Sequence, residues 1–338
     1  MDSRVTSTPA PSGPPDDQAP LPPITELSFA ATGVRSLCWD GDELVDWVGG
    51  GQRWTLDGRA LPPVREPEAV FDDAVVLPGS PWAAVFEQRG ETGLLLRDGR
   101  PWRPLTRAEH CASCYSYPIA LFRLADGRAV IAHCPESYCC LQIDDLETGT
   151  TLAACPLAAA DDYFPAGLEV SPCGRWLLSA AGWVWHPISN VRVYDIDAAL
   201  RDPATLGGEG LPIAVWADCA DASFLPDSRL LVTLTGNWAD LDDGVHHEDE
   251  LALYDLAAPA TPRRWPLDGW TCGVMALGCD HAFTFHGHLR LVALDGLREL
   301  RSWPSLTLDV GVRAFDSALG RVAWAQGDRI TILQLQTT

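Results

Sequence analysis

The feature that most constrains this chain is an internal repeat. A short apolar strand, a turn rich in Gly, Pro, Asp or Ser, and a second apolar strand recur, and a third strand follows that often ends in an acidic residue. The clearest copies are LEVSPCGRWLLSA with VRVYDI at residues 191–196, and ASFLPDSRLLVTLTG with LALYDL at residues 251–256. The turns fall near residues 41, 79, 127, 174, 228, 279 and 319. Their spacing of roughly 40 to 55 residues is typical of four-stranded propeller blades, so seven turns predict seven blades.

The strands of the repeat are predicted to pack between neighbouring sheets. Val191 and Val193 alternate with Arg192 and Tyr194, and long helical periodicity is absent. The last repeat supplies only three strands, VRAF, RVAWAQ and RITILQL, whereas residues 24–30, ITELSFA, form a strand with no blade of its own. Because an unpaired edge promotes aggregation, we expect residues 24–30 to complete the seventh blade. The predicted fold is an all-β, seven-bladed β-propeller of four-stranded antiparallel blades, closed by this N-terminal strand, whose removal should unfold the protein.

The two clearest repeats resemble the WD40 family. SPCGRWLLSA followed by VRVYDI is similar to that family's SPDG, LLASG and IRLWDL core, with Tyr194 and Asp195 at its Trp-Asp position. Tyr254 and Asp255 stand at the same place in the next repeat. The resemblance is best over residues 166–256 and weaker over residues 73–150. The family's Gly-His before the first strand is missing in every blade, so its structural His–Asp network is not carried over.

The composition of the chain predicts the boundaries of the folded domain and the cellular location of the protein. Residues 1–23 are Pro-rich and poor in apolar residues, which predicts a disordered tail before a single propeller domain over residues 24–338. The chain lacks a secretory signal and any apolar run long enough to span a bilayer. We therefore expect a cytoplasmic protein that does not bind membranes, with its 11 cysteines reduced.

The charge of the chain limits its partners. The formal net charge is −22, and all 24 basic residues are Arg. Nucleic acids and anionic membranes need a basic surface, so neither is an expected partner. An acidic surface predicts solubility and a preference for basic partners. We expect a monomer.

Four long connections suggest where recognition takes place. Residues 106–117, 157–167, 182–190 and 237–249 all link strands on the same face of the predicted propeller, and loops on a rigid scaffold are common recognition sites. Their aromatic residues are interleaved with His, Asn and carboxylates, as at an interface or the rim of a pocket. The predicted binding face comprises Tyr115, Tyr117, Asp161, Asp162, Tyr163, Phe164, Trp183, Trp185, His186, Asn237, Trp238, His246 and His247. The alternative interpretation is that these rings fold inward, where they plug the axial channel or hold their own loops in place.

Two clusters contain residue types that bind metals. The first comprises His110, Cys111, Cys114, His133, Cys134, Cys139 and Cys140, a set that zinc prefers. Cys134, Cys139 and Cys140 fall within predicted strands, so buried free thiols are the favoured interpretation. The second is the acidic stretch 240–250, whose carboxylates suit calcium. Its DLDDG does not match an EF-hand loop, so a solvated acidic loop is favoured. No metal or cofactor is predicted.

Two function hypotheses remain open. No nucleophile elbow, P-loop or dinucleotide fingerprint is present. The favoured hypothesis is a non-enzymatic scaffold that binds a protein or peptide partner through the loop-rich face. The alternative is a propeller hydrolase or lyase, with or without a metal, whose site lies over the central axis. Asp161 and Asp162 are its candidate acid–base residues.

Overall fold

The computed structural model describes residues 23–336, except 68, 185–187, 212, 214–217, 236–248, 268–272, 278–279 and 308–311. Apart from Pro23, the predicted tail over residues 1–23 lies outside the described residues, as does the predicted turn at residue 279.

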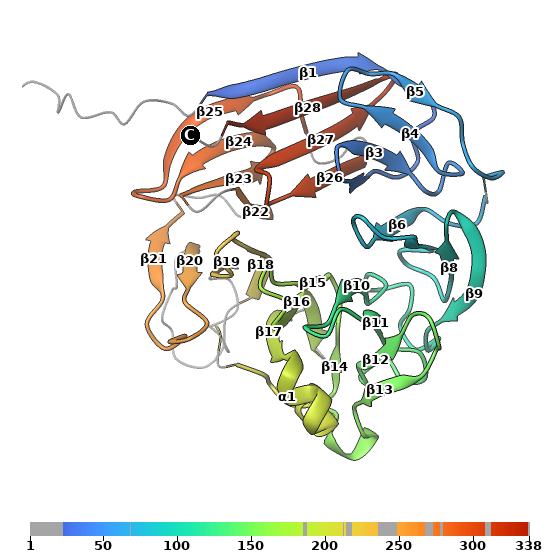
Figure 1. Cartoon of the computed structure of the whole chain (residues 1–338). Coiled ribbons are helices and arrows are strands. Elements are labelled where there is room, and N and C mark those ends of the chain that lie inside the picture. The colour runs from blue at the N-terminus through green and yellow to red at the C-terminus, as the bar shows by residue number, and fades with distance from the viewer. Residues whose placement is uncertain are drawn as a thin grey trace, which may run out of the picture.

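The strands form seven antiparallel sheets of four strands each, and these sheets are arranged in a ring (Figure 1). We number them as blades one to seven in chain order. Blade one comprises β2 (Cys38–Asp40), β3 (Glu43–Asp46), β4 (Gln52–Thr55) and β5 (Ala60–Leu61). Blade two comprises β6 (Asp73–Val76), β7 (Trp82–Phe86), β8 (Thr92–Arg97) and β9 (Arg100–Thr106). Blade three comprises β10 (Ile119–Arg123), β11 (Ala129–His133), β12 (Gln142–Asp145) and β13 (Thr151–Ala154).

Blades five to seven follow the same order from the centre of the ring outward, and blade four departs from it. Blade four comprises β14 (Tyr163–Phe164), β15 (Leu168–Val170), β16 (Trp176–Val184) and β17 (Ile188–Asp195). Blades five and six are β18 (Asp218–Phe224), β19 (Leu230–Thr235), β20 (Glu250–Tyr254) and β21 (Arg263–Pro266); and β22 (Gly273–Leu277), β23 (His281–His286), β24 (His288–Ala293) and β25 (Arg298–Trp303). Blade seven is β26 (Val312–Asp316), β27 (Arg321–Gln326), β28 (Arg329–Leu335) and β1 (Ile24–Ala30).

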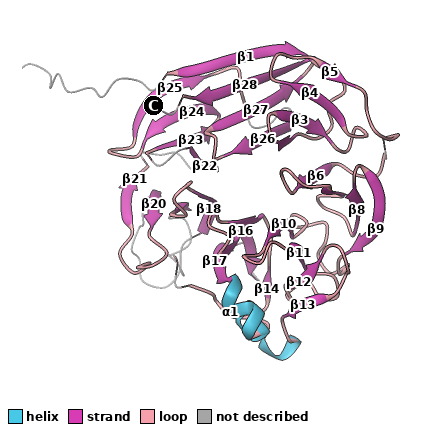
Figure 2. Cartoon of the chain, in the orientation of Figure 1, coloured by secondary structure: helices cyan, strands magenta, loops and turns pink. Residues whose placement is uncertain are grey.

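Blade four departs from the regular pattern. Both β14 and β15 pair with β16, so these two short strands share the innermost position. The helix α1 (Ile196–Arg201) begins directly after β17, and Asp195 caps it by accepting a hydrogen bond from the Ala198 amide. A short 3₁₀ helix, Pro203–Leu206, follows. Figure 2 shows α1 beside β17 at the periphery of the ring, where a covered strand edge is protected from pairing with other chains.

The N-terminal strand closes the ring, as the sequence predicts. β1 pairs with β28 along all seven of its residues, from Ile24 opposite Leu335 to Ala30 opposite Arg329. The two ends of the folded domain therefore lie in one sheet, and blade seven has no unpaired fourth position.

The turn between the first two strands of a blade recurs around the ring. Six of the predicted turns contain a residue with positive φ, a conformation that glycine adopts without strain. These residues are Gly41, Gly79, Gly127, Gly174, Ser228 and Gly320. Neighbouring turns also contact each other, since the Gly79 amide donates to Asp40 Oδ1 at 3.1 Å and the Cys173 amide donates to Ser228 Oγ at 3.1 Å.

Apolar packing between neighbouring blades holds the ring together. The described residues form seven large clusters of buried apolar side chains, one in each interface between successive blades. The cluster between blades seven and one contains Trp39 and Trp54 from one sheet, and Ala323, Ile330 and Ile332 from the other. An interface of this kind between the last blade and the first is what distinguishes a closed propeller from an open stack of sheets. No helix in the described part of the chain is long and apolar enough to cross a membrane.

Candidate functional site

Long connections from adjacent blades meet at one end of blades three and four. Residues 107–118 link β9 to β10, residues 134–141 link β11 to β12, and residues 155–162 link β13 to β14. The first and third of these link the outermost strand of one blade to the innermost strand of the next, and the second links the two middle strands of blade three. In antiparallel blades both kinds of connection emerge at the same end of the sheets, where β16 also ends. Their rings form a contact group that we call the aromatic cluster: His110, Tyr115, Tyr138, Phe164 and Trp183.

Phe164 is the centre of the aromatic cluster. It is fully buried, and its ring centroid lies 4.4 Å from that of Tyr138, 5.0 Å from that of Tyr115 and 5.0 Å from that of Trp183. His110 stacks on it at 5.8 Å. Edge-to-face and offset contacts at these distances are favourable for aromatic pairs. The cluster therefore joins separate connections into one packed unit.

Local strand pairing explains why Phe164 and Trp183 meet. They are cross-strand partners, because β14 pairs with the end of β16. Tyr163 points to the other side of the ladder, where its hydroxyl donates to Ser179 Oγ at 2.8 Å and the Asn190 carbonyl at 3.2 Å. A Cβ on Gly182 would lie 1.7 Å from this hydroxyl, so only glycine fits beneath Tyr163.

A buried arginine holds residues 107–118 in shape. Arg107 is 4% exposed and donates to the backbone carbonyls of Gly90 at 2.6 Å, Tyr115 at 3.2 Å and Ser116 at 3.1 Å, as well as to that of Ala112. Its guanidinium also lies over the rings of Tyr115 and Tyr117, at 4.6 and 5.0 Å. Charge-assisted hydrogen bonds to loop carbonyls stabilise a loop that has no regular structure of its own.

The two candidate acid–base residues each have a separate partner. Asp161 Oδ2 forms a 3.0 Å ion pair with Arg192, whose guanidinium lies over the Tyr163 ring at 3.9 Å. Asp162 Oδ1 accepts a 2.6 Å hydrogen bond from Tyr138, and this bond raises the pKa of the Tyr138 hydroxyl to about 12. Both carboxylates therefore stabilise the loop before β14 through contacts at the surface, Asp161 with Arg192 of β17 and Asp162 with Tyr138.

The predicted binding-face residues fall into four groups. Tyr115, Tyr117, Tyr163 and Phe164 are buried, Trp183 is half-buried, and Asp161 and Asp162 are exposed. Trp185, His186, Asn237, Trp238, His246 and His247 lie outside the described residues. The four buried rings pack on other segments: Tyr115 and Phe164 contact each other, Tyr117 packs on Phe86 of β7, and Tyr163 bonds residues of β16 and β17.

Sequence reasoning missed the connection at residues 134–141. The prediction that Cys134, Cys139 and Cys140 lie within strands is wrong, because β11 ends at His133 and β12 begins only at Gln142. Tyr138 thereby lies in a loop that reaches Phe164. Pro135 and Ser137, which separate two apolar stretches, are the signal that identifies this loop.

The cysteines of blade three gather near this loop. Cys134, Cys139 and Cys155 are buried and Cys140 is half-buried. Burial raises the pKa of Cys155 to about 12, which favours the neutral thiol. The described residues contain no group of three or more His, Cys, Asp or Glu side chains placed to hold a metal ion.

A buried His–Asp pair also went unrecognised in the sequence. His133 on β11 and Asp144 on β12 are each 4% exposed, and His133 Nε2 lies 3.0 Å from Asp144 Oδ2. Gln142 donates to the other carboxylate oxygen at 2.8 Å. The pair joins the adjacent strands β11 and β12 of blade three.

Comparison with known proteins supports the fold. No protein-family model matches the chain, and no curated protein is similar to it in sequence. Among solved structures, 1129 chains match, so a likeness to one of them does not identify a function. One is the hydrazine synthase of Kuenenia stuttgartiensis, with 14% identity, a TM-score of 0.61, and coverage of 90% of this chain and 96% of that chain. At this identity the similarity shows the shared fold alone. The class of protein is therefore a seven-bladed β-propeller.

Proposed function

We propose that this propeller is a non-enzymatic scaffold that binds a protein or peptide partner with a basic segment. The recognition surface is the outer side of the aromatic cluster and the connections that carry it. The observation that supports this most is the combination of a rigid, packed loop set with an exposed surface of one charge sign.

The charges of this surface are uniformly acidic in the described connections. Glu109, Glu136, Asp161 and Asp162 are all exposed. The basic residue of these connections, Arg107, is buried beneath them. A surface with exposed charge of one sign attracts a partner of the opposite sign and repels others.

The same surface offers apolar contact area. Leu157 is 70% exposed in the connection from β13 to β14, and Trp183 is half-buried at the edge of the aromatic cluster. Because the loops are already ordered by Phe164 and Arg107, a partner that docks here does not have to order them. Preorganisation of this kind increases affinity.

Peptide selection tests the proposal. The full-length chain is immobilised and used to select random linear peptides, and the enriched peptides are measured by fluorescence polarisation. We expect enrichment of peptides rich in Arg and Lys with an apolar residue. The double variant Glu109→Lys/Glu136→Lys should weaken their binding by about tenfold or more, which corresponds to about 1.4 kcal/mol.

A matched control separates the effect of the charges on this surface from the effect of the total charge of the chain. Asp126→Lys/Asp295→Lys changes the net charge equally, but both residues are exposed in turns at the opposite end of their blades. This variant should bind the selected peptides within about twofold of the wild type. Equal loss in the two double variants, or no enrichment over the empty support, would refute the proposal.

A further inference from the structure

Two cysteines lie close together in the connection from β9 to β10. Cys111 and Cys114 are separated by Ala112 and Ser113. The Cys114 amide donates to the Cys111 carbonyl at 2.8 Å, so these four residues form a hydrogen-bonded turn. The end Cα atoms of such a turn lie within about 7 Å of each other, and a disulfide needs a Cα separation of about 4.4–6.8 Å. The backbone of the turn therefore holds the two cysteines close to the separation that a disulfide requires.

The conformation of this loop is fixed around Cys111. The Ala112 amide donates to the Glu109 carbonyl at 3.0 Å, which makes Cys111 the third residue of a second turn. Its φ is 55°, a left-handed conformation that glycine adopts without strain. Arg107 donates to the carbonyls of Ala112 and Tyr115 and so holds both turns from beneath. The chain thus keeps a cysteine at a position where its backbone conformation favours glycine.

The two thiols differ in their access to solvent. Cys114 is exposed, whereas Cys111 is half-buried and packs against Tyr115 and Phe164 of the aromatic cluster. Burial and the neighbouring Cys114 thiol raise the pKa of Cys111, which favours its neutral form. A reagent in solvent therefore reaches Cys114 first, and Cys111 is placed to react in a second step.

The other described cysteines lack this combination of features. Five of them are buried or half-buried, which limits their contact with a reagent in solvent: Cys38, Cys134, Cys139, Cys140 and Cys155. Cys173 is exposed, but it lies in the turn between β15 and β16, which contains no second cysteine. Among the described residues, an exposed cysteine with a second cysteine in the same turn therefore occurs only in the connection from β9 to β10.

We propose that Cys111 and Cys114 are a redox-active pair that reduces a low-molecular-weight disulfide, such as glutathione disulfide, and closes into an intrachain disulfide. The Cys114 thiolate attacks one sulfur of the external disulfide and releases its first thiolate, so a mixed disulfide forms on Cys114. The Cys111 thiolate then attacks Cys114 Sγ and releases the second thiolate. The two protons of the cysteines pass to the two released thiolates. The pair loses two electrons, the external disulfide gains them, and the exchange is reversible. This activity does not rest on the binding of a partner at the surface proposed above.

Equilibration with glutathione tests the pair. The full-length chain is incubated at increasing ratios of glutathione disulfide to glutathione, quenched with acid, alkylated and digested with trypsin. Because trypsin cleaves after arginine, both cysteines lie in one peptide, residues 108–123. We expect this peptide to change from a doubly alkylated form to an unalkylated form that is two hydrogens lighter than the dithiol. A peptide that stays doubly alkylated at every ratio overturns the proposal.

The equilibrium constant of this exchange tests the part played by the turn. Because the folded loop holds the two cysteines close together, disulfide formation should be about tenfold or more favourable in the folded chain than in the same chain unfolded in urea. A constant that is equal or smaller in the folded chain overturns the proposal, since the fold would then not favour the disulfide.

Serine variants assign the two steps to the two cysteines. Cys111→Ser should accumulate one glutathione on Cys114, because the second thiol is missing, and Cys114→Ser should leave Cys111 unmodified. Cys173→Ser removes the exposed cysteine in the turn between β15 and β16 and is the matched control. It should form the disulfide between residues 111 and 114 at the same ratio as the wild type. A mixed disulfide that persists on Cys114 in the wild type, or loss of the 111–114 disulfide in Cys173→Ser, would refute an exchange within one turn.

Discussion

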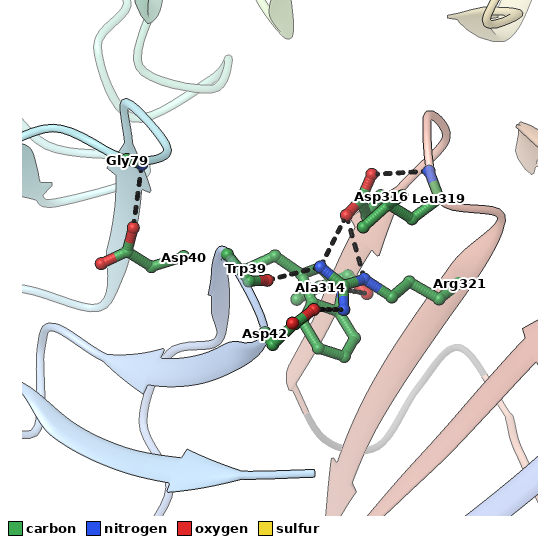
Figure 3. Close-up of polar contacts among 9 residues, drawn as sticks. Trp39, Asp40, Asp42, Gly79, Ala314, Asp316, Leu319 and Arg321 are labelled. Carbon is green, nitrogen blue, oxygen red and sulfur yellow. Dashed lines mark hydrogen bonds and ion pairs between the residues drawn. The ribbon is translucent and has the colours of Figure 1, made fainter.

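Arg321 links the last blade to the first, and its replacement tests how the ring is closed. It lies on β27 and is 1% exposed. Its guanidinium donates to Asp316 Oδ2 at 3.0 Å through Nε and to Asp42 Oδ1 at 3.3 Å, as Figure 3 shows. It also donates to the Gly41 carbonyl. It also lies 3.9 Å from the centre of the Trp39 ring, and Trp39 Nε1 donates to the Ala314 carbonyl at 3.2 Å.

The cost of Arg321→Leu follows from the burial of each partner. Removing one member of a buried ion pair costs about 3–5 kcal/mol. The Asp316 side chain is 18% exposed and keeps a hydrogen bond from the Leu319 amide, so the lower end of that range applies. Loss of the cation–π contact adds about 0.5–1 kcal/mol. Asp42 is 84% exposed and contributes little. We expect Arg321→Leu to lower the free energy of unfolding by about 3–4 kcal/mol.

Urea unfolding followed by tryptophan fluorescence measures this change, since the chain contains 14 tryptophans. A fall of this size should shift the midpoint by about 1 M or more. Asp42→Ala is the matched control and should change the unfolding free energy by less than about 0.5 kcal/mol. The reasoning fails if Arg321→Leu unfolds at the wild-type midpoint, or if Asp42→Ala is equally destabilised.

Three further predictions concern buried groups. Asp46 is 1% exposed and accepts four hydrogen bonds, so Asp46→Ala should lower the unfolding free energy by about 3 kcal/mol in the same urea assay. Burial raises the pKa of Glu169 from 4.5 to about 8, although the Phe224 amide donates to it at 3.4 Å. Between these pH values the folded state holds a proton that the unfolded chain has lost, so the unfolding free energy of the wild type should fall from pH 4.5 to pH 8. Glu169→Gln should therefore be the more stable protein at pH 8 but not at pH 4.5. Equal dependence of the unfolding free energy on pH in the two proteins would contradict this. Gly182→Ala should displace Tyr163 from its buried position and lower the thermal midpoint by several degrees, which differential scanning calorimetry measures, whereas an unchanged midpoint would show that the ring can move aside.

The number of blades and their closure were predictable because both depend on local signals. Each turn between the first two strands is marked by Gly or by a Pro-Asp-Ser sequence, and the six of these turns that the structure describes contain a residue with positive φ. The missing fourth strand of the last repeat directly implicates residues 24–30. The outer part of blade four was less predictable. The helix α1 directly follows β17, where the repeat predicts another strand.

The aromatic cluster was predictable only in part. The prediction that Phe164 and Trp183 lie in the connections 157–167 and 182–190 is wrong, because Phe164 lies on β14 and Trp183 near the end of β16. Their pairing depends on β14, an extra strand that is only two residues long. The loop that contains Tyr138 was missed because Cys139 and Cys140 follow it directly and are apolar, so that the next strand was expected to begin with them. Burial of Tyr115 depends on Arg107 beneath it, and no spacing rule in the sequence connects the two.

The claim on which all of these inferences depend is that the two ends of the domain pair in one sheet. Ser28 Oγ and Thr331 Oγ1 lie 3.4 Å apart between β1 and β28. In the double variant Ser28→Cys/Thr331→Cys, peptide mapping under non-reducing conditions after mild oxidation should find a disulfide between residues 28 and 331 within one chain. The control Ser28→Cys/Ser113→Cys should give no such link. A missing 28–331 link, or one that forms only between two chains, would contradict the closed propeller.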